Sequence, residues 1–239
     1  MKPPFIFIDK SVYFPKLKIL AITDLHLGYE TMLRERGLIF PLNQLEESKK
    51  DIRNIMKFLE KKKYDVKKII ILGDLKHQFG FSYGEAYEVR DFLRYTENFV
   101  SGENLILIKG NHEKIELDKN RYRDFYIEDE TAFLHGDRIF PEVLDKKIKT
   151  LVMGHSHPSV TISDKKGIKK EKYKCFLIGK WKGKEAIVLP SFFSFNEGSK
   201  IVDGFNKDFF IIPQKTLKNF KVHVVGKEKV YEFGKLGEI

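Results

Sequence analysis

Short apolar runs alternate with longer amphipathic stretches through the first half of the chain. The apolar runs are rich in isoleucine and leucine and have the length of buried strands, whereas the amphipathic stretches repeat their apolar positions at helical spacing. Strands that alternate with helices in this way favour a parallel sheet joined by right-handed crossovers. The runs that predict strands are 5–8, 17–23, 68–72 and 105–108.

Two helices are predicted between these strands. Apolar side chains recur at helical spacing from Pro41 to about Lys63, and a proline suits the first turn of a helix. Ser82 is followed three residues later by Glu85, which is the pattern of a capping box and predicts the start of the second helix. The residues between Thr23 and Pro41 show no clear periodicity, so we expect a loop there.

The second half of the chain has a different pattern. Helical periodicity is nearly absent after residue 125, and short apolar segments predict further strands instead. A second sheet packed on the first, with helices on the outer faces, would bury both sets of apolar side chains. We therefore predict one α/β domain over residues 1–239, built as a four-layer αββα sandwich with two mixed β-sheets. The strands predicted in this half are 131–134, 150–153, 160–163, 173–178, 186–189, 209–212 and 221–225.

Composition adds constraints on compartment and partners. Charged residues make up 33% of the chain and the formal net charge is +10. A positive charge of this size would attract phosphate-rich polymers, although a generally ionic surface would account for the same excess of charged residues. Cys175 is the single cysteine, so no internal disulfide can form and any metal site must use oxygen and nitrogen ligands. No apolar run is long enough to span a membrane and the first residues lack a signal peptide, so we expect a cytoplasmic protein.

Five separated segments end apolar runs on residues that ligate metals. Because the carboxyl ends of parallel strands meet at one edge of a sheet, we expect these side chains to gather there. In an extended segment, residues two apart point to the same side, so both members of an Asp-x-His or His-x-His pair would face one cavity. The segments are Asp24-Leu25-His26, Gly73-Asp74, Gly110-Asn111-His112-Glu113, His135-Gly136-Asp137 and Gly154-His155-Ser156-His157.

The order and residue types of these segments resemble the calcineurin-like metallophosphoesterases, whose motifs read D-x-H, G-D, G-N-H-[ED], H and G-H-x-H. The resemblance spans Asp24 to His157 and implies the αββα sandwich and two divalent metal ions. Two ions that lie close together need a bridging carboxylate, which we assign to Asp74. Manganese is expected from the family, and iron, zinc or nickel suit the same mixed ligands. By resemblance, the other ligands are Asp24, His26 and His157 for the first ion, and Asn111, His135 and His155 for the second.

The resemblance also implies a reaction. A hydroxide bridging the two ions would attack a phosphodiester in line, so we predict a phosphodiesterase acting on nucleic acid or nucleotides. Family members use the residue at His112 to stabilise or protonate the leaving oxygen, and either Glu113 or Asp137 could orient its imidazole. Two alternatives stay open: a phosphomonoesterase acting on nucleotides, sugar phosphates or phosphoprotein, and a non-catalytic interaction module on the same fold.

A narrower similarity concerns the residues after the first motif. Gly28, the arginines Arg34 and Arg36, and then Pro41 are similar to the ligase-associated, PdeM-like phosphoesterases and their archaeal relatives. Such a protein could be a nuclease that works with a DNA-repair helicase or ligase. The two arginines could clamp a phosphate, or they could be loop charges that pair with neighbouring glutamates. His77 is expected either at the rim of the site, where it would contact substrate, or in a structural role.

Two further questions are left open by the sequence. The aromatic residues Phe192, Phe193 and Phe195 follow the last motif and could form either a base-stacking platform or part of the core. An exposed strand edge near the C-terminus could form a homodimer.

Overall fold

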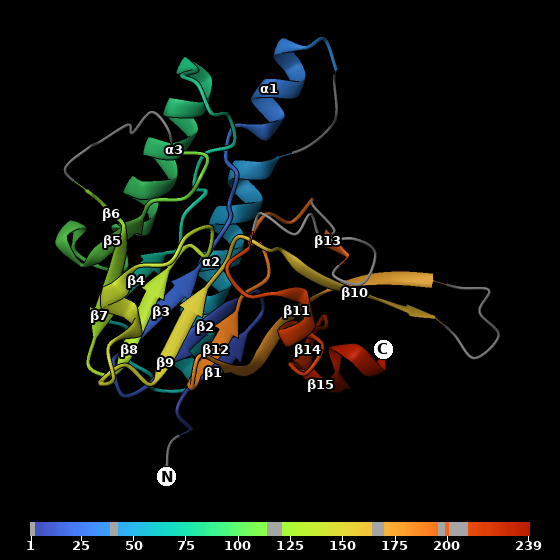
Figure 1. Ribbon diagram of the computed structural model, residues 1–239. Helices are drawn as coiled ribbons and strands as arrows, with labels where there is room; N and C mark the ends of the chain where they lie inside the picture. The colour runs from blue at the N-terminus through green and yellow to red at the C-terminus, as the bar shows by residue number, and fades with distance from the viewer. Residues whose placement is uncertain (1–2, 39–42, 114–120, 164–169, 196–198, 201–209) are drawn as a thin grey trace.

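Two β-sheets stack face to face in the computed structural model of the protein (Figure 1), which describes residues 3–38, 43–113, 121–163, 170–195, 199–200 and 210–239. Both sheets are mixed. The first has the strand order β1-β2-β3-β4-β5-β6, and the second has the order β13-β10-β11-β12-β9-β8-β7, with β14 paired to β11 and β15 paired to β14. The predicted pair of mixed sheets is thereby confirmed.

The first sheet contains the parallel strands that the apolar runs predict. Strands β3 to β6 are parallel, while β1 and β2 form an antiparallel hairpin that extends the sheet beyond β3. Two strands of this sheet were not predicted: β2 is short and follows a tight turn at Asp9, and β6 has only two residues. The strands are β1 (Ile6–Ile8), β2 (Ser11–Phe14), β3 (Ile19–Ile22), β4 (Lys68–Ile71), β5 (Leu105–Ile108) and β6 (Tyr122–Arg123).

The second sheet confirms most of the strands predicted after residue 125. The strand predicted at 209–212 is wrong for residues 210–212, which form a bend in which the Ile211 N–H donates to the Gly136 carbonyl; Phe209 lies outside the described residues. Strands β7, β13 and β15 are additional to the prediction. The strands are β7 (Phe125–Glu128), β8 (Thr131–Leu134), β9 (Thr150–Met153), β10 (Pro158–Ser163), β11 (Lys170–Trp181), β12 (Lys184–Val188), β13 (Ser199–Lys200), β14 (Lys221–Val225) and β15 (Val230–Lys235).

The helices differ from the prediction at their starts. The segment expected to be a loop contains α1. The first predicted helix begins at Gln44, with Asn43 as its N-cap, and its predicted start at Pro41 lies outside the described residues. Ser82 does precede the second helix, but its side chain makes no capping hydrogen bond and Glu85 accepts N–H groups from the loop before it. No helix in the described ranges is both long and apolar enough to cross a membrane. The helices are α1 (Tyr29–Glu35), α2 (Gln44–Lys61), α3 (Tyr83–Thr96), α4 (Gln214–Leu217) and the 3-10 turns η1 (Gly102–Asn104), η2 (Pro141–Leu144) and η3 (Leu236–Glu238).

Three hydrophobic clusters separate the four layers. In β4, Ile69 and Ile71 pack under α2 and α3, whereas Ile70 faces the second sheet, so this strand is buried on both sides. The outer face of the second sheet, which includes the buried Cys175, is covered by side chains of η2, α4 and η3. The αββα arrangement is confirmed, with one outer layer of long helices and, within the described residues, one of short turns.

Candidate metal centre

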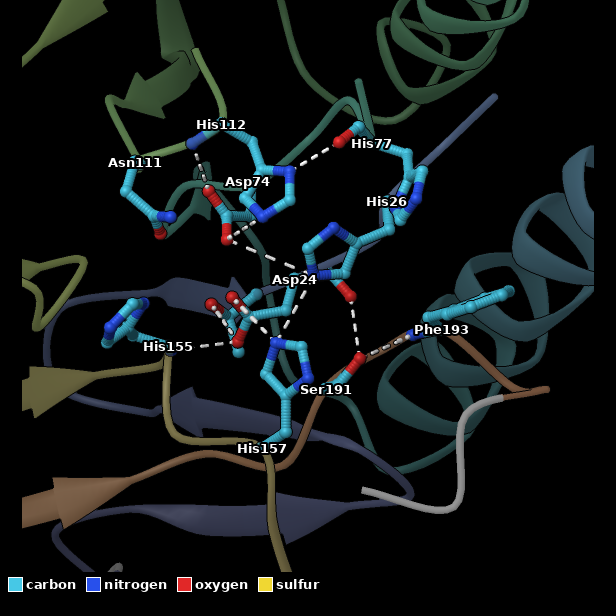
Figure 2. Close-up of polar contacts among 12 residues, drawn as sticks. Asp24, His26, Asp74, His77, Asn111, His112, His155, His157, Ser191 and Phe193 are labelled. Carbon is cyan, nitrogen blue, oxygen red and sulfur yellow. Dashed lines mark hydrogen bonds and ion pairs between the residues drawn. The ribbon is translucent and has the colours of Figure 1, made fainter. Parts of the chain in front are cut away.

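The predicted ligands converge at the ends of strands from both sheets. Asp24 follows β3, Asp74 follows β4 and Asn111 follows β5, while the histidine motifs follow β8 and β9 of the second sheet. Figure 2 shows side chains of these loops turned toward a common centre. The carboxyl ends of the parallel strands therefore gather the side chains as expected.

Four of these side chains form a first group. His26 Nε2 lies 3.2 Å from His157 Nε2, and His157 Nε2 lies 3.3 Å from Asp24 Oδ1. The Asp74 Oδ2 atom completes the group at 3.9 Å from His26 Nε2. Each of the four side chains offers one donor atom to a metal ion, and these atoms lie within 4.8 Å of one another. Two imidazole nitrogens this close would repel as two acceptors, so a cation or a proton between them is needed.

A second group shares one atom with the first. His135 Nε2 lies 3.5 Å from Asp74 Oδ2, 3.2 Å from Asn111 Oδ1 and 3.0 Å from His155 Nδ1. Asp74 Oδ1 instead accepts the backbone N–H of His112 at 3.0 Å. This hydrogen bond fixes the carboxylate so that its Oδ2 atom faces both groups. Asp74 is thus the one residue that belongs to both of these ligand groups in the described part of the chain.

Five of the converging residues have left-handed backbones. The φ angles are 53° at Asp24, 49° at His26, 47° at Asp74, 65° at His155 and 44° at His157. This conformation is unfavourable for residues other than glycine and concentrates at functional sites. The expectation that the two-apart pairs are extended is therefore wrong, and they face one centre through sharp turns instead.

Glu113 holds the loops after β4 and β5 together. Its buried carboxylate accepts the backbone N–H groups of Gly110 at 2.8 Å, Leu75 at 2.6 Å and Asp74 at 3.1 Å. It therefore does not orient His112, and no interaction joins Asp137 to His112 within the described ranges. The Nδ1 atom of His112 instead contacts the backbone carbonyl of His77.

A short segment after β12 fixes the backbone of Asp24. The Ser191 hydroxyl donates to the Asp24 carbonyl at 2.8 Å, and the Phe193 N–H donates to the same oxygen at 3.2 Å (Figure 2). The half-buried Lys174 ammonium donates to the carbonyls of Ser191 and Phe193. Sequence reasoning missed Ser191 and Lys174, because neither belongs to a ligand motif. They support the strained turn that aims the Asp24 carboxylate.

Glycine at position 154 allows a close approach between the two sheets at this site. A Cβ atom there would overlap Thr23 Oγ1 and lie 2.7 Å from Asp24 Oδ2. Gly110 is constrained in the same way, since its Cβ would overlap Asp74 and lie 2.7 Å from Glu113 Oε2. Both glycines are therefore required by space for the ligands to converge.

The electrostatics suit cation ligands. Burial, reinforced by His157, lowers the pKa of His26 to about 3, which keeps its imidazole neutral near neutral pH. Burial alone would raise the pKa of Asp74, but His135 and His26 lower it below its usual range, so the carboxylate is ionised. Burial likewise opposes protonation of His135, yet Asp74 and Asp24 raise its pKa. A cation that binds here must displace that proton from His135.

Comparison with known proteins identifies the family. Residues 17–174 match the calcineurin-like phosphoesterase family. The chain belongs to that family. The matched range contains every predicted ligand from Asp24 to His157, and membership, together with the Asp and His clusters, supports binding of divalent metal.

One solved structure shares the fold of this calcineurin-like phosphoesterase at low identity, and a second matches it more weakly. The nuclease MPE from Pseudomonas putida is 18% identical with a TM-score of 0.59, over 94% of this chain and 92% of that chain. A metallophosphoesterase from Sphaerobacter thermophilus is 11% identical with a TM-score of 0.36, over 91% of this chain and 88% of that chain. No curated protein matches.

The residues predicted to bind substrate have different environments. Arg34 forms an ion pair with Glu30, whereas Arg36 is exposed at the end of α1. His77 has its donor nitrogens within metal-ligand reach of His26 and His112. Burial lowers the pKa of His77 to about 4, and the neighbouring His112 and Arg36 add to this effect. The neutral imidazole of His77 therefore lies beside the ligand groups, and Arg36 is close enough to affect its pKa.

The three phenylalanines after the last motif separate into different roles. Phe192 is fully buried in the core under the first sheet. The ring of Phe193 lies 6.5 Å from that of His26, and Phe195 is 42% exposed. Core packing is thus correct for Phe192 and for Phe193, which is 4% exposed and packs beside the site, while Phe195 faces solvent.

Proposed function

We propose that this calcineurin-like phosphoesterase is a two-metal-dependent phosphodiesterase that acts on nucleic acid or nucleotides. One observation carries the proposal: Asp74 Oδ2 lies 3.9 Å from His26 Nε2 and 3.5 Å from His135 Nε2, between two separate ligand groups. A shared carboxylate oxygen is the feature that a pair of close cations requires.

The donor set fits divalent cations. It combines the carboxylates of Asp24 and Asp74, the amide oxygen of Asn111 and four imidazoles. The buried Asp24 Oδ1 receives no hydrogen bond of good geometry from the described residues, which suits an oxygen that faces a cation. Bound divalent ions would supply Lewis acidity toward phosphoryl oxygens and an activated water. We propose manganese at both positions from the family resemblance, because the same oxygen and imidazole ligands also suit iron, zinc and nickel.

His112 is the residue we propose to act on the leaving group. Its side chain is 18% exposed, and its Nε2 atom lies 3.9 Å from Asp74 Oδ2 at the mouth of the site. The contact between Nδ1 and the His77 carbonyl holds a proton on Nδ1, so Nε2 is the atom that gives a proton to the departing oxygen or takes one. The stacked ring of Phe79, 4.3 Å away, holds the imidazole in place.

The choice of substrate rests on charge and shared fold. The net charge of +10 favours polyanions, and the Pseudomonas putida protein with the same fold is named a nuclease. We further propose that the chain is a single-domain, cytoplasmic member of the ligase-associated, PdeM-like branch. Arg34, Arg36 and His77 are proposed to contact the substrate. A DNA-repair helicase or ligase is the proposed partner, and homodimerisation through β15 is the proposed assembly.

Hydrolysis by metal-stripped protein with added manganese tests the proposal. We expect a bis-aryl phosphodiester to be cleaved faster than an aryl phosphomonoester, with no cleavage in chelator. His112→Ala should lower kcat by about 10²–10⁴ on a nucleotide diester, whose alkoxide leaving group needs a proton, and less on the aryl diester. His223→Ala, which removes a histidine on β14 away from the ligand groups, should leave both rates unchanged.

Two results would contradict the proposal. Faster cleavage of the monoester would make the protein a phosphomonoesterase. No cleavage of any ester with manganese, iron, zinc or nickel would favour a non-catalytic interaction module.

A further inference from the structure

We propose that the outer face of α3 and the loop before it form a binding surface for single-stranded nucleic acid, and this inference rests on the proposed phosphodiesterase function. The surface consists of Phe79, Phe81, Tyr83, Tyr87, Arg90 and Arg94, and we call it the aromatic stripe. It begins beside His112 and continues along α3, away from the ligand groups.

The spacing of the helical members places them on one face. Tyr83, Tyr87, Arg90 and Arg94 follow one another at intervals of four, three and four residues, which keeps them on one side of a helix. Tyr83 is 86% exposed and Tyr87 is 68% exposed, and both arginines are exposed. The opposite face of α3, which includes Val89 and Phe92, is buried in the core. The stripe is therefore the face of α3 turned to solvent, and its large aromatic rings do not serve the core.

The loop before α3 continues the row of rings to the site. Phe81 is 50% exposed, and its ring lies 5.0 Å from the ring of Tyr83 in an edge-to-face contact. Phe79 is 48% exposed and stacks on His112 with an angle of 20° between the rings. In Figure 1, α3 stands beside α1 above the sheets. A polymer whose scissile bond lies at His112 would pass directly onto these rings.

The charge along the stripe favours a polyanion. The three carboxylates of α3 are all engaged elsewhere: Glu85 accepts N–H groups of the preceding loop, Glu88 accepts the Gly28 N–H and the Thr31 hydroxyl, and Asp91 pairs with Lys49. In contrast, Arg90 and Arg94 form no ion pair within the described residues, so both guanidinium groups are available for phosphates.

Rings and arginines together favour a single strand over a duplex. Exposed aromatic faces stack on bases, and bases in a duplex already stack on each other, so only unpaired bases can use the rings. Arg90 and Arg94, which follow the rings along α3, would contact the backbone phosphates of the same strand. A duplex would use the arginines alone.

Binding of oligonucleotides, measured in the presence of a chelator that removes metal and so prevents hydrolysis, tests the inference. We expect a labelled single-stranded oligonucleotide to bind more tightly than the duplex of the same sequence, by fluorescence anisotropy. The double variant Tyr83→Ala, Tyr87→Ala should weaken single-strand binding at least about 10-fold, since each stacked base contributes about 1–3 kcal/mol. The matched control Tyr231→Ala, Phe233→Ala removes two exposed rings from β15, 46% and 44% exposed, and should leave the affinity unchanged.

A second variant provides an independent readout. The double variant Arg90→Ala, Arg94→Ala should make the slope of log affinity against log salt shallower, by about 0.7 for each phosphate that an arginine no longer neutralises. The control double variant Lys57→Ala, Lys61→Ala on α2 should leave the slope unchanged. Equal affinity for duplex and single strand, or unchanged affinity in both stripe variants, would overturn the inference. Failure of the wild type to cleave the bis-aryl diester would instead overturn the proposed function, so the two failures are distinguishable.

Discussion

Asp74→Ala is expected to abolish phosphodiester hydrolysis, with kcat/KM for a bis-aryl phosphodiester lowered at least about 10³-fold. The reason is that Asp74 Oδ2 is the oxygen shared by the ligand groups of His26 and His135, so its loss affects both groups at once. The rate should be measured with the metal-stripped variant over a manganese series. Added manganese should not restore activity. The lost carboxylate would be shared by both ions, so a higher manganese concentration cannot replace it.

Asp65→Ala is the matched control. That carboxylate is half exposed and pairs with Lys18 at 2.9 Å, and it precedes β4, whereas Asp74 follows the opposite end of that strand. We expect it to leave kcat/KM unchanged, because exposed ion pairs contribute little even to stability. Asp74→Ala that keeps more than a tenth of the wild-type rate would contradict the assignment of the shared carboxylate.

Gly154→Ala is expected to remove metal binding and to destabilise the fold by several kcal/mol. The added Cβ would overlap Thr23 Oγ1 and lie 2.7 Å from Asp24 Oδ2, and neither atom can move freely. Thr23 is fully buried, and its hydroxyl also approaches the Leu72 carbonyl at 3.2 Å. Overpacking of a buried site typically costs about 1–3 kcal/mol, and displacement of a buried carboxylate adds to that cost.

Thermal unfolding with and without manganese measures both effects for Gly154→Ala. The wild type should unfold at a higher temperature when manganese is present, because a ligand that binds only the folded state stabilises it. The variant should have a lower midpoint that manganese does not raise. Gly80→Ala is the control, since a Cβ at Gly80 meets nothing within 4 Å. If manganese raised the unfolding midpoint of Gly154→Ala as much as that of the wild type, the close approach at Gly154 would not be needed for metal binding.

The sequence predicted the parts of the fold that depend on local pattern. Runs such as Leu105–Ile108 are apolar at every position because the strand is buried on both faces, and this signal located β5 at its observed bounds. The order of the ligand motifs then predicted which loops meet. Both signals are carried by neighbouring residues, so they are readable without the tertiary structure.

Features that depend on distant contacts were not predictable. Helix α1 has only seven residues and ends in a charged stretch, and its position is fixed by contacts such as Thr31 with Glu88 of α3. Glu85 was expected to cap its own helix, but the loop of His77 supplies two N–H donors to it. The left-handed turns at Asp24 and His26 were missed for the same reason, because they are stabilised by Gly73 and Ser191 from other parts of the chain.

Counting the bound ions tests the central claim most directly. Crystals of the wild-type protein soaked in manganese should show two anomalous scattering peaks on either side of Asp74 Oδ2, about 3.5–4 Å apart. The same crystals of Asp74→Ala should show fewer than two. A wild-type structure with a single peak, or with manganese bound only away from Asp74, would contradict the account.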